Sequence, residues 1–308
     1  MMKAGMKYWL AILKNAVRLW LDVQAFTHAA ALAFFTIFSV APVMIVAVTI
    51  VGIVLGQEAA QGQLAQQIES FIGPNAAQAV QAAVDASRIE ISGIFPTLAG
   101  IGTILLGATT VFAQMKISLN AVWGVSPRPT RSGLRVLIRA RLLALAVIFL
   151  MSSVMLASLL LSVTVRVLVT FAEQWLPIPS LLLLALDAGI ALFVATLLFA
   201  AIFRVLPDVV LEWRDVWLGA LMTGLLFTLG RSLIAYYLST TATASTYGAA
   251  ASLVLLLLWV HYSSLILLFG VAFTRARLEA RGLAVQPRAT AIRVHLEIVE
   301  EPRNSSLH

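Results

Sequence analysis

The chain has 308 residues, of which 61% are hydrophobic and 11% are charged, with a formal net charge of +7. Soluble domains carry about 25% charged residues, so most of this apolar surface is expected to face lipid or neighbouring helices. The composition excludes an ordinary soluble domain and predicts an integral membrane protein. Cysteine is absent, which excludes disulfides, thiolate catalysis and cysteine-based metal sites.

Residues 3–22 precede the first long apolar run and have the pattern of an amphipathic helix. With about 100° of rotation per residue, Lys7 and Lys14 fall on one side. Trp9 and Trp20 fall on the opposite side. Two interpretations fit this pattern equally well. The helix lies in the membrane interface with its cations on anionic lipid, or it packs against the protein's own cytoplasmic surface.

Six apolar runs follow, each close to or above the roughly 20 helical residues that cross a bilayer. We expect transmembrane helices at about 27–55, 93–119, 139–169, 180–203, 213–238 and 249–274. The last run is the clearest, because it has no formally charged side chain between Ala249 and Phe273. The fold class is therefore all-α, with an interfacial helix (1–25), a six-helix membrane domain (26–275) and a polar cytoplasmic tail (276–308).

Several local features refine this outline. Pro42 is expected to kink the first span near its middle. Residues 56–92 are polar and predict two short amphipathic helices over the outer mouth of the bundle. Glycines of the second span, Gly107 among them, predict close approach of another helix. The tail is expected to be a loosely ordered appendage.

The distribution of lysine and arginine predicts the orientation. Nearly all of them fall in the N-terminal helix, in the tail and in the connections that share their side of the membrane. Only Arg88, Arg166 and Arg231 lie on or near the other side. The positive-inside rule then places both termini in the cytoplasm, in agreement with an even number of spans. The predicted location is the bacterial inner membrane.

Charged side chains within the spans are costly, at about 2.5–3.5 kcal/mol on insertion scales, so each requires a reason. Asp187 and Arg231 lie at similar depths in the outer half, with Arg166 just above Arg231. A pair between Asp187 and Arg231 would form either a gate and substrate anchor or a structural ion pair that fixes helix register. Arg166 has a further interpretation, which is snorkelling to the outer interface.

Other polar residues are weaker candidates. His261, about halfway through the last span, has either a proton-linked role or an inter-helix hydrogen bond. Tyr247 is a substrate contact or an aromatic belt residue. At the inner face, candidates for binding lipid headgroups are Lys116, Arg128, Arg131, Arg135 and Arg204. Snorkelling and helix capping explain Lys116 and Arg204 equally well.

An enzyme is not predicted. The sequence contains no HExxH, paired-carboxylate, Gly-x-Ser-x-Gly or GxxxxGK[ST] arrangement. We therefore expect no catalytic residues, no metal site and no cofactor. Arginines between the second and third spans would position RNA phosphates without cleaving them, so no nucleic-acid partner is expected. The predicted partners are membrane lipids.

Six passages, taken in order and spacing, resemble the YihY/BrkB family of bacterial inner-membrane proteins. They are Ala29–Pro42, Leu119–Val125, Arg204–Pro207, Trp213–Ala220, Ser245–Val254 and Leu258–Gly270. The resemblance implies six membrane helices with cytoplasmic ends. The family carries the label virulence factor and an older label, ribonuclease BN, which is regarded as a misassignment. Transport or flipping of an envelope lipid has been suggested for some relatives.

These observations favour a transporter or flippase of an amphiphilic, anionic, lipid-like envelope component. The first alternative is a membrane scaffold that organises envelope machinery and transports nothing. The second, less favoured, is a membrane-associated ribonuclease, which would need a metal site or a nucleophile–base pair that the sequence does not display.

Overall fold

The computed structural model describes residues 2–56, 94–128, 133–173, 180–240 and 249–294, with positions 66, 69, 77, 80 and 81. Within these ranges the chain is almost entirely helical. The elements are α1 (Met2–Asp22), α2 (Ala25–Leu55), α5 (Ile94–Trp123), β1 (Val125–Pro127), α6 (Gly133–Glu173), α7 (Ser180–Val205), α8 (Trp213–Thr240), α10 (Ala249–Ala280) and β2 (Ala291–Arg293).

A long helix occupies the position of each predicted span. Three segments of the described chain are long and apolar enough to cross a membrane, namely Ala25–Val48, Ala188–Val205 and Leu256–Ala280, while Arg141–Val154 is apolar but shorter. The all-α membrane class is therefore confirmed at this coarser level, whereas the number of six spans stays a prediction. The amphipathic segment predicted at 56–92 lies almost wholly outside the described residues.

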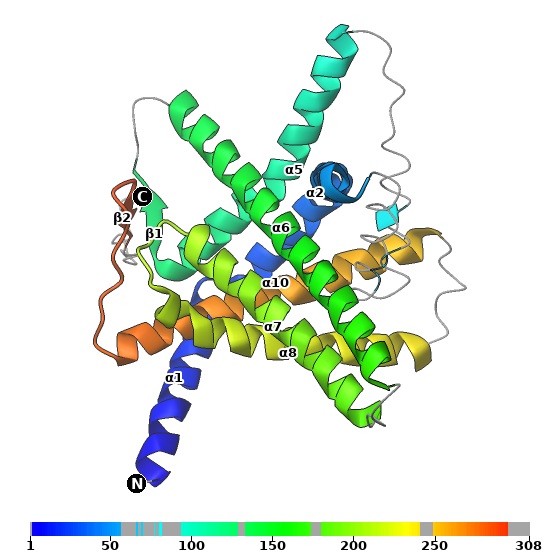
Figure 1. Ribbon diagram of the computed structural model, residues 1–308. Coiled ribbons are helices and arrows are strands. Elements are labelled where there is room, and N and C mark those ends of the chain that lie inside the picture. Colours follow the sequence, from blue (N-terminus) through cyan, green and yellow to red (C-terminus); the bar gives the residue numbers. More distant parts are fainter. Residues whose placement is uncertain are drawn as a thin grey trace.

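Helix α10 is the centre of the bundle. It packs against α1, α2, α5 and α8, while α6 and α7 lie further out and pack against each other (Figure 1). Its inner face includes Leu268 and Val271, both 0% exposed. The apolar run that was clearest in the sequence is thus the element that the other helices cover.

Helices α8 and α10 approach closely because small residues face each other where they cross. A Cβ atom added at Gly219 would overlap the Thr274 hydroxyl, and one added at Gly270 would overlap the Thr223 hydroxyl. Each threonine donates its hydroxyl proton to the carbonyl four residues earlier on its own helix, over 2.7 Å for Thr223 and 2.8 Å for Thr274. The two Gly-x-x-x-Thr segments therefore interlock without leaving a buried hydroxyl unsatisfied.

The close approach predicted for the second span is confirmed at Gly107. A Cβ atom there would lie 2.7 Å from Cγ of Pro42 in α2, which is shorter than side chains tolerate. Glycine at this position thus lets α5 pack directly against the proline of α2.

Helix α1 packs on α10 through one face only. Ile12 and Ala16 are buried against Phe273 and Ala276, and the Trp20 indole donates a hydrogen bond of 3.1 Å to the carbonyl of Leu265. Packing on the protein's own surface is thereby confirmed for this face. The helix leaves the bundle at a steep angle to α10, with its N-terminus furthest away (Figure 1).

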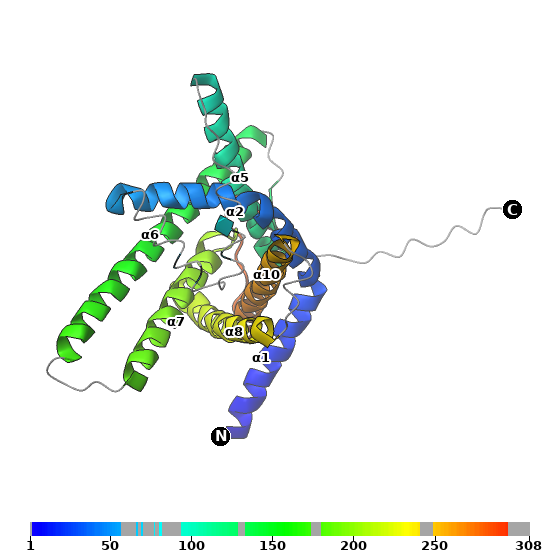
Figure 2. The same cartoon turned by 90° about the vertical axis from the view of Figure 1, so that its right-hand side faces the viewer.

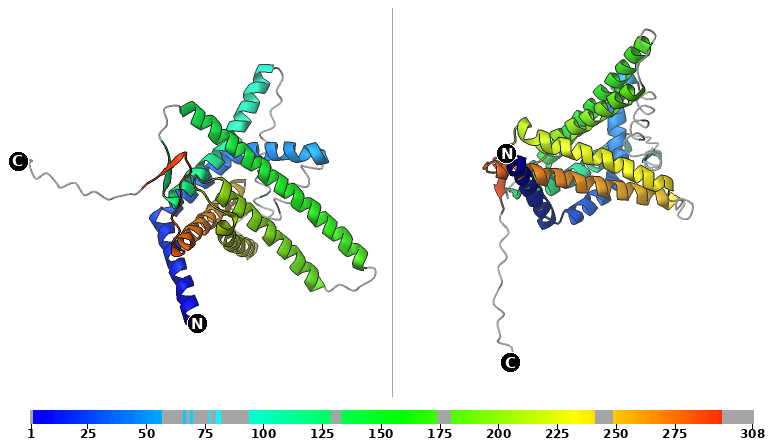
Figure 3. Two further views of the ribbon diagram at one scale, coloured as in Figure 1. Left: turned by 60° about the vertical axis from the view of Figure 1, so that its left-hand side comes forward. Right: turned by 90° about the horizontal axis from the view of Figure 1, so that it is seen from below.

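The helices converge at one end of the bundle and spread toward the other (Figures 2 and 3). The converging end carries β1 and β2 and is hereafter the sheet end; the opposite end is the far end. Trp123 and Phe203, at 1% and 0% exposure, are buried at the sheet end. Toward the far end, Ile53 and Leu233 are 82% and 67% exposed. Apolar surface in the far half is therefore left for lipid or another apolar partner.

Residues 276–294 are folded, in contrast to the loosely ordered structure that was predicted for this part of the tail. Helix α10 continues to Ala280, and β2 pairs antiparallel with β1 so that Val125 lies opposite Arg293. An isolated bridge joins Val209 to Pro287. The prediction failed because three-residue strands have too little periodicity to be recognised in a sequence.

Candidate functional site

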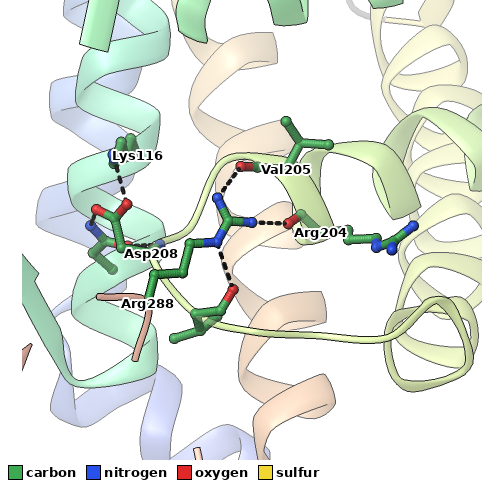
Figure 4. A network of polar contacts seen from close by, with 7 residues as sticks. Lys116, Arg204, Val205, Asp208 and Arg288 are labelled. Carbon is green, nitrogen blue, oxygen red and sulfur yellow. Dashed lines mark hydrogen bonds and ion pairs between the residues drawn. The ribbon is translucent and has the colours of Figure 1, made fainter. Parts of the chain in front are cut away.

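A buried carboxylate lies at the sheet end, where the chain turns between α7 and α8. The Asp208 side chain is 7% exposed, and one oxygen lies 2.9 Å from the Lys116 ammonium on α5 (Figure 4). The Asn120 amide, one turn further along α5, donates a hydrogen bond of 3.0 Å to the other oxygen. Its own carbonyl accepts a bond of 2.8 Å from the Asp208 main-chain N–H. The buried charge is thus fully paired.

Arg288 caps the C-terminal end of α7. Its guanidinium donates to the carbonyl oxygens of Arg204, Val205 and Val209, over 3.0, 3.5 and 3.2 Å (Figure 4). The Arg288 main-chain N–H donates to the Asp208 carbonyl over 2.8 Å. The last carbonyls of a helix lack partners within it and carry negative partial charge, so a cation is the favoured cap. Arg288 consequently joins the folded tail to the same turn that holds Asp208.

Arg275 gives α5 a similar cap. Its Nη1 donates a bond of 2.7 Å to the Val122 carbonyl, and its Nε lies 2.8 Å from a Glu279 carboxylate oxygen. Gly124, the residue after the last residue of α5, has a φ of 64°. It ends the helix in the left-handed region that glycine enters without strain. The main chain then continues directly into β1.

Two more contacts complete the set. Arg281 lies 2.9 Å from Asp215 and joins the end of α10 to the first turn of α8. Asn15 of α1 donates a bond of 3.3 Å to Glu279 of α10. Polar side chains therefore hold the ends of α5, α7, α8 and α10 together at the sheet end, and Asn15 joins α1 to this set.

The predicted headgroup candidates have different surroundings. The charge of Lys116 is compensated by Asp208, although its side chain remains 23% exposed. The Arg204 guanidinium lies 4.4 Å above the Trp213 ring, a cation–π contact that leaves its charge available. Arg128 is exposed just after β1. Arg131 lies outside the described residues, as does the side chain of Arg135 in α6.

The predicted substrate residues fall largely outside the described side chains. Asp187, Arg231 and Arg166 belong to α7, α8 and α6, but their side chains are not described, and Tyr247 lies outside the described residues. The Asp187–Arg231 pair stays a prediction. His261 is half-buried in α10, with its ring centre 6.5 Å from that of Phe26 in α2.

Three further residues at the sheet end were not predicted as functional: Asp208, Arg275 and Arg288. The only local signal was Asp208, an acidic residue isolated in a Pro-Asp turn. Arg275 is the last residue of the predicted membrane domain (26–275), and Arg288 stood in the segment interpreted as a loose tail (276–308). The main-chain carbonyls that they bind lie far away in sequence, so no spacing rule connects the two arginines with those carbonyls.

Long apolar helices, a polar cluster at one end and apolar surface at the other define the class as an α-helical membrane protein. The family model described as Virulence factor BrkB matches residues 16–292, which is most of the chain. The chain belongs to this family, as the resemblance in its sequence indicated.

Curated relatives carry the name UPF0761 membrane protein. The one from Verminephrobacter eiseniae is 29% identical over 84% of this chain, and the chain spans 59% of that relative's length. The one from Pseudoalteromonas translucida is 27% identical, covering 87% of this chain and 84% of the relative. These names place the relatives in a membrane and give no activity. No solved structure matches the chain.

Proposed function

We propose that the chain moves an anionic, amphiphilic envelope component across the bacterial inner membrane. We further propose that the structure represents the conformation in which the sheet end is closed. The observation that carries the proposal is the asymmetry of the bundle. Polar side chains tie the helices together at the sheet end, while the helices spread toward the far end (Figure 2). Ion pairs and hydrogen bonds exchange with water, so ties of this kind can open in an alternating-access cycle.

The test is lipid translocation by the purified protein in liposomes that contain a fluorescent phosphatidylglycerol. A membrane-impermeant reductant bleaches only the accessible leaflet, so translocation appears as additional bleaching. We expect wild type to be active and Asp187→Asn and Arg231→Gln to be slower by at least about tenfold, since each would leave a charge unpaired. Absence of activity in wild type would contradict the proposal. Full activity in both variants would mean that Asp187 and Arg231 do not form part of the lipid translocation path.

The finer topology is part of the same proposal: six spans, with both termini and the sheet end in the cytoplasm. Its support is the gathering of cations there, since α1, the folded tail and the residues around β1 hold most of the described lysines and arginines. The absence of cysteine makes the test direct. A single cysteine at exposed Thr290 should react with an impermeant maleimide in inverted vesicles and not in intact cells. The reverse result would contradict the orientation.

The scaffold alternative is favoured by one observation. Leu10 and Val17 of α1, which are 58% and 40% exposed, form an apolar stripe on a helix that projects from the bundle. A protein partner would cover such a stripe. Stable co-purification of one envelope protein, lost on Leu10→Ser and Val17→Ser, together with no lipid translocation, would favour the scaffold over the transporter.

A further inference from the structure

Arg141 is the one charged residue with a described side chain that contacts the apolar middle of a neighbouring helix. It lies in α6, and its Nη1 donates to the Thr109 hydroxyl over 2.6 Å and approaches the Thr110 hydroxyl at 3.4 Å. The same nitrogen lies 3.3 Å from the carbonyl oxygen of Leu106. All three partners belong to α5 and all are neutral.

The charge of Arg141 is therefore not compensated within the described chain. No carboxylate contacts it there, and its Nε and Nη2 groups make no hydrogen bond with the described residues. Lys116 is the useful comparison, because Asp208 compensates its charge at 2.9 Å. An arginine presents donors in a rigid fork, and here Nη1 is fixed by α5 while Nε and Nη2 have no partner among the described residues.

The surroundings of Arg141 are those of a lipid-facing surface. Arg141 is only partly buried, while the next residue, Leu142, is 61% exposed and Leu106 is 56% exposed. Thr109 precedes Lys116 by two turns, so the guanidinium meets α5 about 10 Å farther from the sheet end than Lys116 does. A lipid whose acyl chains cover this surface brings its own headgroup close to Arg141. That headgroup is then the nearest negative charge outside the described chain.

We propose that Arg141 binds the phosphate of an anionic lipid at the contact between α5 and α6. The Nε and Nη2 groups donate hydrogen bonds to two phosphate oxygens in the bidentate geometry that guanidinium favours, and Leu106 and Leu142 contact the acyl chains. Thr109 and Thr110 hold the guanidinium in place. Binding here is independent of the transport proposed above, because a lipid can occupy the site whether or not it crosses the membrane.

The test is titration of the full-length protein in detergent with phosphatidylglycerol, read as bound lipid by native mass spectrometry. Phosphatidylcholine and inorganic phosphate are titrated in parallel. Arg141→Gln should weaken phosphatidylglycerol binding about tenfold, because it removes the charge-assisted bonds. The matched control is Arg293→Gln, an exposed cation on β2, which should change binding less than about twofold. Inorganic phosphate should not compete at millimolar concentration.

Three results would overturn the proposal. Equal losses in Arg141→Gln and Arg293→Gln would mean nonspecific attraction to anionic lipid. Competition by inorganic phosphate as effective as that by lipid would identify a free-phosphate site. If Arg141→Gln fails to fold, Arg141→Lys keeps a charge but loses the fork and should weaken binding about threefold; wild-type affinity in that variant would exclude a site built on the guanidinium.

Discussion

The pair of Lys116 and Asp208 contains two charges of unequal exposure. The ammonium side chain is 23% exposed and reaches solvent, whereas the carboxylate side chain is 7% exposed and does not. Removing one partner of a buried pair leaves the other charge without compensation, and the cost depends on how far that charge is from water. The two single substitutions should therefore differ, although they break the same contact.

We predict that Lys116→Met is more destabilising than Asp208→Asn. Lys116→Met leaves a buried carboxylate with only Asn120 as a donor and should cost about 3–5 kcal/mol. Asp208→Asn leaves an ammonium that water can solvate and should cost about 1–2 kcal/mol. Thermal unfolding in detergent, followed by tryptophan fluorescence, measures both.

The double variant provides the control for this comparison. Because neither charge remains, Lys116→Met with Asp208→Asn should be less destabilised than the sum of the single variants. Strict additivity, or a larger loss for Asp208→Asn than for Lys116→Met, would contradict a coupled pair whose carboxylate is the less solvated member.

At the scale of helices, the crossing of α8 and α10 depends on the absence of two methyl groups. Gly219→Ala places a Cβ against the Thr274 hydroxyl and 3.0 Å from the Gly270 carbonyl oxygen, so the helices must separate. We predict a loss of about 1–3 kcal/mol. The matched control is Gly189→Ala in α7, where a Cβ meets no heavy atom within 4 Å and alanine is the better helix former.

Thermal unfolding in detergent distinguishes the two glycine variants. Gly189→Ala should melt at or slightly above the wild-type temperature, and Gly219→Ala clearly below it. Equal melting temperatures would mean that the two helices do not approach as closely as the structure places them.

Helix α1 has three faces: one packs on α10, one carries cations, and the third is the exposed apolar stripe that includes Leu10 and Val17. Val17 is 40% exposed on the apolar stripe, and the adjacent Arg18 side chain is 80% exposed on the cationic face. We predict that the stripe enters the membrane interface while the cations meet anionic headgroups. This joins both interpretations of residues 3–22, since one face packs on protein and another contacts lipid.

Single-cysteine variants test the placement of α1. A fluorophore at Val17→Cys should be quenched by lipids brominated on their acyl chains and protected from iodide in water. The same fluorophore at Arg18→Cys should show the opposite behaviour. Equal access to iodide at both positions would mean that α1 projects into water.

At the scale of the whole molecule, hydropathy predicted the positions of the long helices but not how they meet. An apolar run specifies that a segment avoids water, and this is a local property of residues such as those from Ala249 to Phe273. It does not specify which face of the helix contacts protein. Gly107 was an exception, because the sequence predicted that its missing side chain allows close approach of another helix. Its partner, Pro42, was still not predictable.

The polar cluster at the sheet end was beyond prediction for a related reason. Asp208 and Asn120 are 88 residues apart, and neither lies in a local motif that requires the other. Arg288 binds main-chain carbonyls. Every residue carries such a carbonyl, so no residue type in the sequence identifies the ones that Arg288 binds. The long-range contacts that close one end of the bundle are therefore visible only once the helices are placed.

Closure of the sheet end can be tested by locking it. Val125 of β1 lies opposite Arg293 of β2, and directly opposed antiparallel residues have Cα atoms about 4.5–5.5 Å apart, within the range that a disulfide spans. In this cysteine-free chain, Val125→Cys with Arg293→Cys should form a crosslink on mild oxidation. The control pair, Val125→Cys with Ile292→Cys, should not, because neighbouring residues of a strand point to opposite faces.

If the sheet end must open for lipid to pass, the crosslinked protein should translocate lipid at least about tenfold more slowly than the reduced protein, because the crosslink holds the end of α5 to the folded tail. Reductant should restore the wild-type rate, which separates a locked protein from a damaged one. Unchanged translocation in fully crosslinked protein would mean that the cargo passes without separation of β1 from β2. The polar cluster around Asp208 would then be a fixed structural support, and any gate would lie nearer the far end.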